Sequence, residues 1–232
     1  MANIHRIPLG TSNIYLIEDA GALIIVDAGN RHLAKRFFKK LDTYGIRPDQ
    51  IKLIVITHVH FDHVGSLKAI KDTCQCPVAV HTSEAILLRN GTTVIPGGMN
   101  MLGKTLKKLG DHVLLAVPAL FRFPAVEPEI LVSDEMPLVD FGLAGKIIYT
   151  PGHTRGSLSL LLAGGEAFVG DLAVNYLPFN LSPIFPPFAD DPEGLIRSWK
   201  MLLEKDAQTI YPGHGRPFSA QILRQKLSSR RK

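Results

Sequence analysis

A segment with three histidines and one aspartate within six residues carries the clearest chemical signal in this sequence. Residues 57–65 read THVHFDHVG and directly follow a short apolar run at residues 53–56. Alternate side chains of an extended segment point the same way, so His58 and His60 can converge on one point. Asp62 and His63 follow where the chain leaves the strand. Imidazole and carboxylate ligands suit zinc, iron or manganese, so this turn predicts a metal site.

Three more side chains of the same types occupy equivalent positions further along the chain. His153, Asp171 and His214 each come just after an apolar strand, in a turn that contains Gly or Pro. Strands that end at one edge of a sheet would bring such turns together. The complete set of candidate ligands is His58, His60, Asp62, His63, His153, Asp171 and His214.

Alternating strands and helices are needed to position these side chains. Short β-branched runs predict strands at 14–17, 23–26, 53–56, 77–80, 146–149, 157–162, 167–169 and 209–211. Amphipathic segments predict helices at 31–44, 65–72, 83–88, 99–109, 191–203 and 219–227. Asp190 or Asp191 is the expected cap of the helix that starts with Pro192. This order predicts an α/β (α+β) fold.

Length and composition fit one compact domain. The 232 residues are 46% hydrophobic and 20% charged, which predicts a single domain over residues 1–232. The net charge of +5 is concentrated at the carboxyl end, where we expect a solvated terminus and no nucleic acid partner. Cys74 and Cys76 are predicted to be free thiols, which favours a cytoplasmic location. No secretory signal or transmembrane segment is predicted.

Residues 91–128 are the least regular part of the chain. They are rich in Met, Leu and Phe and lie between the ligand turn and the next candidate ligands. We expect an apolar insert or cap here. A substrate lid, a dimer surface and a membrane-contacting patch all remain open, because exposed apolar surface serves each of them.

The motif at 57–65 resembles the metal-binding signature of the metallo-β-lactamase superfamily. With the later ligands included, the resemblance covers nearly the whole chain and is to the hydrolase branch of glyoxalase II and the N-acyl homoserine lactonases. It implies a four-layer αβ/βα sandwich with metals at one edge. It also implies the roles of the candidate ligands: His58, His60 and His153 hold a first metal, Asp62, His63 and His214 hold a second, and Asp171 bridges them. An Asp-x-Gly in the same family makes Asp27 the residue expected to orient a ligand.

The implied chemistry is hydrolysis with two divalent ions, zinc being expected and iron or manganese the alternatives. Two such ions about 3.5–4 Å apart share one hydroxide, which attacks the substrate carbonyl. Asp62 is the expected proton shuttle beside its ligand role, and Asp171 completes the catalytic pair. We expect an ester, thioester or lactone of a small, partly apolar molecule as substrate. Tyr176 is a candidate for contact with it, and a homodimer is left open.

Departures from the family pattern leave rival functions. Only 18 residues follow His214, so the extra helical domain with which glyoxalase II helps bind glutathione is not expected. Lactamases of the superfamily do not normally bridge with an aspartate like Asp171, which disfavours antibiotic hydrolysis. A mononuclear iron enzyme like the persulfide dioxygenases, a phosphodiesterase or ribonuclease, and a non-catalytic binding protein are the alternatives.

Overall fold

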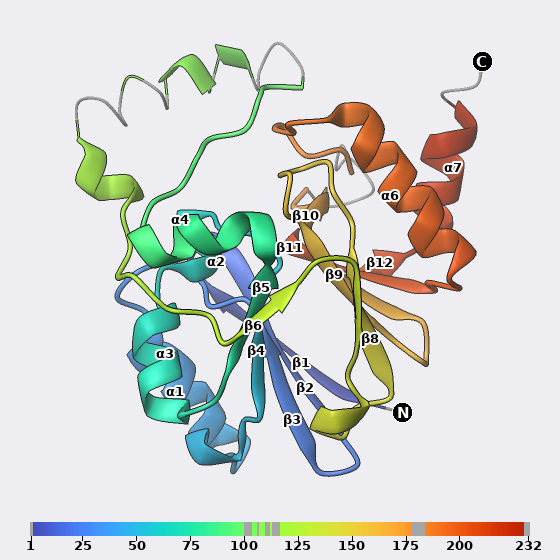
Figure 1. Cartoon of the computed structure of the whole chain (residues 1–232). Helices are drawn as coiled ribbons and strands as arrows, with labels where there is room; N and C mark the ends of the chain where they lie inside the picture. Colours follow the sequence, from blue (N-terminus) through green and yellow to red (C-terminus); the bar gives the residue numbers. More distant parts are fainter. Residues whose placement is uncertain are drawn as a thin grey trace.

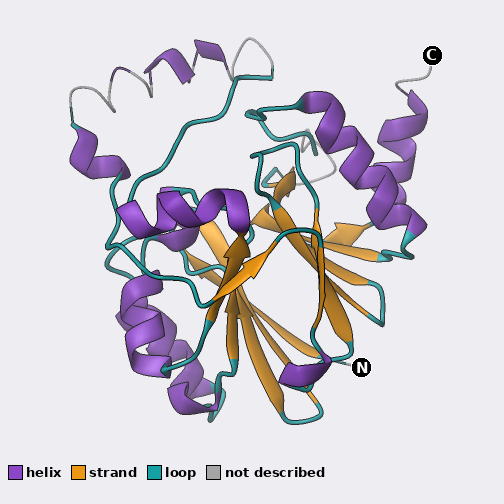
Figure 2. Cartoon of the chain, viewed as in Figure 1, coloured by secondary structure: helices purple, strands orange, loops and turns teal. Residues whose placement is uncertain are grey.

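Two mixed β-sheets packed face to face make up the centre of the molecule. The computed structural model describes residues 2–99, 104–105, 107–109, 112, 117–177 and 184–229. In Figures 1 and 2 the two sheets lie between two sets of helices, one on each outer face. The predicted αβ/βα sandwich is therefore confirmed.

The first sheet contains strands β1 to β6 in chain order. Its strands are β1 (Asn3–Leu9), β2 (Ser12–Asp19), β3 (Ala22–Val26), β4 (Leu53–Val55), β5 (Val78–His81) and β6 (Ile130–Val132). The first three strands pair antiparallel, and β3 to β6 pair parallel. Because β3 and β4 are parallel, Asp27 and the ligand turn leave the sheet at the same edge.

The second sheet has the order β12-β11-β10-β9-β8-β7. Its strands are β7 (Glu135–Pro137), β8 (Gly145–Tyr149), β9 (Leu158–Leu162), β10 (Glu166–Asn175), β11 (Thr209–Gly215) and β12 (Phe218–Ser219). Only the β10–β11 pair is parallel. The sequence patterns did not predict β1, β6, β7 or β12. Three of these four strands have only two or three residues, too few to show a period.

Two predicted strands are longer than the sequence pattern indicated. The predicted strands 167–169 and 209–211 ended before Asp171 and His214, whereas β10 and β11 continue through both residues. The register between the two strands shifts on either side of Gly170, whose φ is +51°. These candidate ligands therefore lie within an irregular stretch of paired strands rather than in turns after them.

Helices cover the outer faces of both sheets. They are α1 (Ala34–Thr43), α2 (Phe61–Val64), α3 (Leu67–Cys74), α4 (Ala85–Asn90), α6 (Pro192–Glu204) and α7 (Gln221–Ser229), with 3-10 turns η1 (Pro48–Gln50), η2 (Thr82–Glu84), η3 (Pro118–Phe121) and η4 (Val139–Phe141). The predicted helix 31–44 begins only at Ala34, because His32 has a left-handed φ of +64°. The predicted cap of α6 is confirmed: the Asp191 carboxylate accepts a hydrogen bond from the Gly194 N–H at 2.9 Å.

Apolar side chains fill the spaces between all four layers. Strand β2 shows the pattern, since Ile14 and Leu16 join the cluster beneath α1 and α3. Tyr15 and Ile17 belong to the cluster between the two sheets. A third cluster, which includes Trp199, packs the second sheet against α6 and α7. Strands buried on both faces lack a hydrophobic–polar alternation, which is why they read as continuous apolar runs.

The predicted insert at 91–128 lies only partly within the described residues. Positions 100–103, 106, 110–111 and 113–116 lie outside them, and these include five of the eleven positions of the predicted helix 99–109. The described start of the insert pairs with a distant loop: Ala189 N–H donates to Gly97 O at 2.8 Å and Met99 N–H to Pro187 O at 2.9 Å. Among the described residues, no helix is long and apolar enough to cross a membrane.

Candidate metal centre

The turn after β4 carries four of the candidate ligands. The backbone of His60 is extended, and the Nε2 of His58 lies 2.9 Å from the Nδ1 of His60. The structure differs from the expectation that a helix starts at Gly65, because Asp62 and His63 already lie on the single turn of α2. This helical turn directs their side chains to a second point beside the two histidines.

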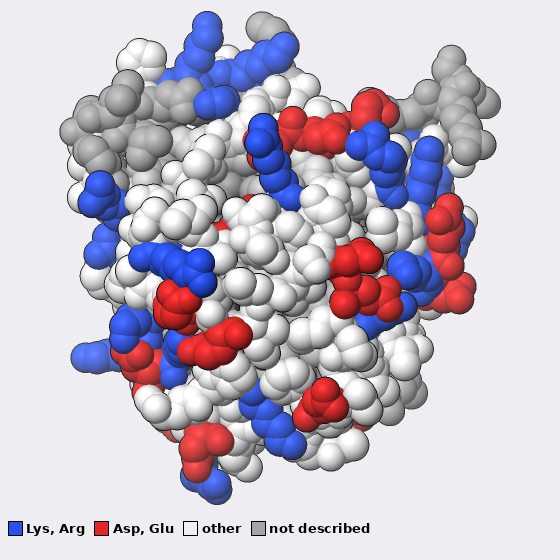
Figure 3. All heavy atoms as spheres, in the orientation of Figure 1, with Lys and Arg blue, Asp and Glu red and all other residues white. Residues whose placement is uncertain are grey.

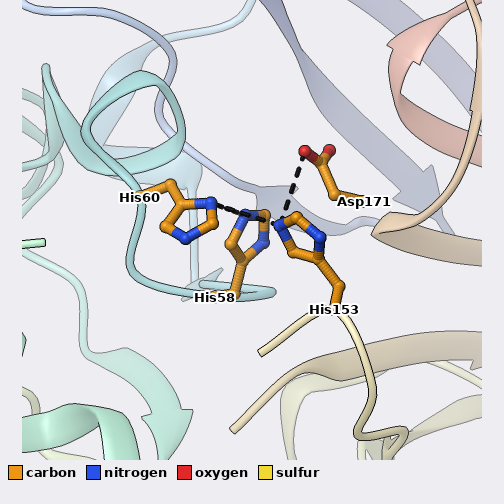
Figure 4. Close-up of side chains that lie close together, drawn as sticks. All are labelled: His58, His60, His153 and Asp171. Carbon is orange, nitrogen blue, oxygen red and sulfur yellow. Dashed lines mark hydrogen bonds and ion pairs between the residues drawn. The ribbon is translucent and has the colours of Figure 1, made fainter. Parts of the chain in front are cut away.

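His153 and Asp171 join His58 and His60 in a first ligand group. One donor atom of each of these four residues lies within 4.8 Å of the others. His153 Nε2 is 3.2 Å from His60 Nδ1 and 3.7 Å from Asp171 Oδ2. Figure 4 shows the four side chains converging from the loop after β4, the loop before β9 and strand β10. Residues about 110 positions apart in the chain thus meet at one edge of the sandwich.

Asp62, His63 and His214 form a second ligand group next to the first. Their donor atoms also lie within 4.8 Å of one another. Asp171 faces this group as well: its Oδ1 lies 3.3 Å from His63 Nε2, and its Oδ2 lies 3.2 Å from His214 Nε2. The structure therefore brings all seven candidate ligands together, with Asp171 between the two groups.

Each histidine of the two groups has its other ring nitrogen bound to an oxygen. The pairs are His58 Nδ1 with Thr57 Oγ1 (3.1 Å), His60 Nε2 with Val94 O (3.1 Å), His63 Nδ1 with Asp27 Oδ2 (2.9 Å), His153 Nδ1 with Phe188 O (2.9 Å) and His214 Nδ1 with Thr11 O (2.8 Å). Carbonyl and carboxylate oxygens only accept, and the Thr57 hydroxyl already donates to Asp27, so in each pair the outer nitrogen carries a proton. The inner nitrogen then presents its lone pair to the centre, as a metal ligand must.

Two buried polar atoms support the fit of this centre to a cation. Among the described residues, His63 Nε2 and Asp171 Oδ1 are buried without a hydrogen-bond partner, although they face each other. An unpaired buried polar atom costs about 1–3 kcal/mol, and native proteins rarely keep one without a bound group. The imidazole and carboxylate donors of the two groups are the set that zinc and related divalent ions prefer.

The protein environment shifts the pKa values of the two groups in opposite directions. Burial lowers the pKa of His58 well below 6.5, and burial together with His153 lowers the pKa of His60 to about 3. Burial would also lower the pKa of His214, but the Asp171 carboxylate raises it to about 9. Asp171 itself has a pKa well below its usual value, because His214 and His63 outweigh its burial. His58 and His60 are thus neutral imidazoles, whereas His214 pairs with the Asp171 carboxylate.

A polar turn between β1 and β2 supports the second ligand group and was not predicted from the sequence. Thr11 Oγ1 donates to Asp62 Oδ2 at 3.0 Å, and Thr11 O accepts from His214. Ser12 Oγ donates to the backbone oxygen of Asp62. The side chain of Asn13 donates to the backbone oxygen of Pro212 at 3.0 Å. The only sign in the sequence is the polar Thr-Ser-Asn run at a strand start, which is also typical of an ordinary turn.

A cavity of about 410 Å³ opens beside both ligand groups. Much of its wall is apolar, and its lining residues are Thr11, His60, Phe61, Asp62, Thr93, Val94, Ile95, Pro96, Phe121, His153, Asp171, Val174, Tyr176, Pro187, Phe188 and His214. Among the described lining residues, Tyr176 is the one ionisable residue apart from the candidate ligands, and it is half-exposed. Its position at the cavity agrees with the prediction that it contacts a substrate, and that role stays a prediction.

A two-sheet sandwich with a His/Asp cluster at one edge defines a class of metal-binding α/β proteins. Residues 7–214 match the family described as the Metallo-beta-lactamase superfamily, so the chain belongs to this superfamily. The prediction of a metal-dependent hydrolase is thereby confirmed at the level of enzyme class.

Several curated relatives match along most of their length. The probable metallo-hydrolase MJ0888 of Methanocaldococcus jannaschii is 30% identical, with 88% of each chain covered. The probable metallo-hydrolase YflN of Bacillus subtilis is 24% identical over 97% of this chain and 88% of its own. The human acyl-coenzyme A thioesterase MBLAC2 is 28% identical over 91% of this chain and 76% of its own.

Solved structures show the same fold. The archaeal superfamily protein ST1585 from Sulfolobus tokodaii has a TM-score of 0.70 at 23% identity, with 100% of this chain and 87% of that chain covered. TTHA1623, solved in a di-iron-bound form, has a TM-score of 0.66 at 23% identity, with 97% of both chains covered. At this identity the likeness shows the fold alone.

Proposed function

We propose that this protein is a dinuclear metal-dependent hydrolase that cleaves an ester, thioester or lactone bearing an apolar group. One observation carries the proposal: two ligand groups with Asp171 between them open onto a cavity with a largely apolar wall. In this proposal the centre supplies the hydrolytic chemistry and the wall receives the apolar part of the substrate.

The proposed ligands divide as the two groups do. His58, His60 and His153 would hold one ion, Asp62, His63 and His214 the other, and Asp171 both. Bound divalent ions at such a centre supply a water of lowered pKa and polarise the carbonyl group that it attacks. Zinc is the expected metal, and the di-iron form of TTHA1623 keeps iron as the alternative. A divalent cation would also satisfy the unpaired atoms His63 Nε2 and Asp171 Oδ1.

Asp62 is the proposed proton carrier. Its carboxylate lines the cavity, and the Thr11 hydroxyl holds its Oδ2. A carboxylate in this position can take a proton at the nucleophile's side and release it toward the leaving group. Tyr176 lines the same cavity and is the proposed donor to the substrate carbonyl oxygen.

The charge of the cavity supports a neutral acyl group. Among the described residues its lining contains no Lys or Arg, so an anionic group of the substrate would meet no cationic side chain there. The human relative named as an acyl-coenzyme A thioesterase supports a thioester within the ester, thioester and lactone class. Figure 3 shows acidic and basic side chains interspersed on one face of the molecule, so we propose a small molecule rather than RNA as substrate.

Four other expectations stay predictions. They are a single domain over residues 1–232, membership of the glyoxalase II or lactonase branch, a homodimer, and a cytoplasmic location. Cys74 and Cys76 are buried free thiols, which supports the proposal of a reducing compartment.

The first experiment is to measure metal per chain on protein purified without chelator or added metal. The variants are His153→Ala and the matched control His81→Ala, since His81 is also buried but stacks on Tyr149 outside the cavity. Two ions per chain, with loss of the ion at the first ligand group in His153→Ala and no loss in His81→Ala, together with turnover in an ester, thioester and lactone panel, would support the proposal. One iron per chain together with oxygen consumption would instead support the mononuclear iron dioxygenase. Little metal after reloading would overturn it.

A further inference from the structure

A buried carboxylate lies outside both ligand groups. Glu84 is the last residue of η2, directly before α4, and its side chain is only 4% exposed. The sequence pattern had placed it within an ordinary predicted helix at residues 83–88. Glutamate is almost never fully buried unless it is paired, so the partners of Glu84 need an explanation.

The first partner of Glu84 lies inside the ligand turn. Val59, the residue between His58 and His60, donates its backbone N–H to Glu84 Oε2 at 2.6 Å. This short contact connects a charged acceptor with the backbone from which both histidines project. On its other side, the Val59 carbonyl accepts a hydrogen bond from Thr93 Oγ1 at 2.9 Å.

The other partners lie in the turn that carries His153. The Thr154 hydroxyl and the Gly156 N–H both face the Glu84 carboxylate and lower its pKa. A Cβ atom on Gly156 would lie only 2.2 Å from Glu84 Cγ, so only glycine permits this approach. Ser157 Oγ accepts from the Thr154 N–H at 3.0 Å and holds the turn in this conformation.

We infer that Glu84 is a positioning residue that holds the His58–His60 turn and the His153 turn at the distance that the first ligand group needs. The two turns are about 95 residues apart in the chain. The Glu84 carboxylate accepts a hydrogen bond from Val59 in the first turn, and the Glu84 side chain lies directly against Gly156 in the second. Two oxygens with several lone pairs can accept from three donors at once, which a neutral side chain of this size cannot match. The inference rests on the proposed metal centre.

Burial raises the pKa of Glu84, and the hydrogen bonds from Thr154, Val59 and Gly156 oppose this rise. These donors are what compensate a buried carboxylate for the loss of water. Residues that support ligands in this indirect way typically change metal affinity about 10–100-fold when they are replaced.

The test is Glu84→Gln, with Glu129→Gln as the matched control. Glu129 also accepts a backbone N–H, from Val78 at 2.9 Å, but it contacts neither ligand turn. Metal-stripped proteins are titrated with Co²⁺ against a competing chelator, and the absorption spectrum of bound Co²⁺ is recorded. His153→Ala and His214→Ala provide reference spectra for loss at each ligand group.

We expect Glu84→Gln to weaken one of the two Co²⁺ affinities about 10–100-fold, with a spectrum that changes as in His153→Ala. Glu129→Gln should bind both ions as the wild type does. A folded Glu84→Gln protein with both wild-type affinities would overturn the inference and leave the proposed function standing. A wild-type protein that binds no ion would overturn both.

A second pair of variants serves if Glu84→Gln does not fold. Thr154→Val removes one donor to Glu84, and Thr154→Ser keeps the hydroxyl. We expect weaker Co²⁺ binding in Thr154→Val and rescue in Thr154→Ser, with similar melting temperatures for the two metal-free proteins. Equal Co²⁺ affinities in the two variants, or a difference only in metal-free stability, would mean a structural role and overturn the inference.

Discussion

The Nδ1 atom of His63 lies 2.9 Å from Oδ2 of Asp27, and both side chains are buried. The same carboxylate accepts the backbone N–H of Thr57 at 2.8 Å and its hydroxyl at 2.9 Å. Asp27 therefore ties the end of β3 to both the start and the helical part of the ligand turn. When Asp27 accepts a hydrogen bond from the Nδ1–H of a neutral His63, the Nε2 lone pair of this histidine faces Asp171.

Replacing Asp27 by Asn should weaken the binding of the metal ion at the second ligand group. Asn tolerates the left-handed φ of +64° at this position, so Asp27→Asn mainly removes the charge. We expect the affinity of the second ligand group to fall about 10–100-fold, as for other outer partners of metal-binding histidines. Competition with a coloured chelator measures this loss, and an unchanged affinity would show that Asp27 has only a turn-forming role.

Replacing Thr11 by Val should weaken the binding of the same metal ion, because the Thr11 hydroxyl binds the ligand Asp62. The variant keeps the shape of Thr11 and its backbone oxygen, which accepts from His214, but removes the hydroxyl that binds Asp62 Oδ2. We expect about 10-fold weaker binding at the second group and little change at the first. Co²⁺ titration compares it with Thr43→Val, where the lost hydroxyl bonds only to Lys40 O at the surface. Equal effects in the two variants would contradict the prediction.

Removing the metals should destabilise the folded chain. Ions that bind only the native state add about 2.7 kcal/mol at a concentration of 100 times Kd. For a chain of this size that corresponds to a melting temperature about 5–10 °C lower after chelation. Calorimetry with and without a chelator measures the shift. The His153→Ala variant should show a smaller shift, and an identical one would argue against its ligand role.

A polar side chain in the cavity wall should reduce activity on long acyl groups. Ile95 lines the cavity, and Ile95→Asn exchanges an apolar contact for an amide. With about 0.8 kcal/mol for each buried methylene, we expect kcat/KM for an octanoyl ester or thioester to fall roughly 10-fold. The value for the acetyl homologue should change much less. Parallel losses for both substrates would mean that the wall does not bind the acyl chain.

Lowering the pH should remove the stabilising contribution of the Lys71–Glu129 ion pair, which lies outside the metal centre. The Glu129 pKa is lowered from its usual 4.5, because hydrogen bonding and the charge of Lys71 outweigh burial. A lowered carboxyl pKa adds stability above about pH 4.5, and this is lost as the pH falls through the folded value. Since Glu129 is about half exposed, Glu129→Gln should cost less than about 1 kcal/mol at pH 7. Urea unfolding of the wild type and of Glu129→Gln should give different free energies of unfolding at pH 7 and equal ones at pH 3.

The sequence alone identified the parts of the centre that are formed locally. His58, His60, Asp62 and His63 lie on one turn, so their spacing already implies that they converge. Eight of the strands and the cap of α6 follow from apolar runs and turn chemistry, which are properties of neighbouring residues. The sandwich fold followed from the resemblance of the ligand motifs to a known family.

Only the tertiary structure decided which distant groups support that turn. Asp27, Thr11 and Glu84 reach their partners across 25 to 51 residues, and the polar residues that do so resemble ordinary turn or helix residues in the sequence. The irregular pairing of β10 with β11 likewise places Asp171 and His214 through register, not through local pattern. The physical reason is that local residue types determine strands, helices and turns, whereas hydrogen bonds between distant loops and the shape of a cavity exist only after the sheets have packed.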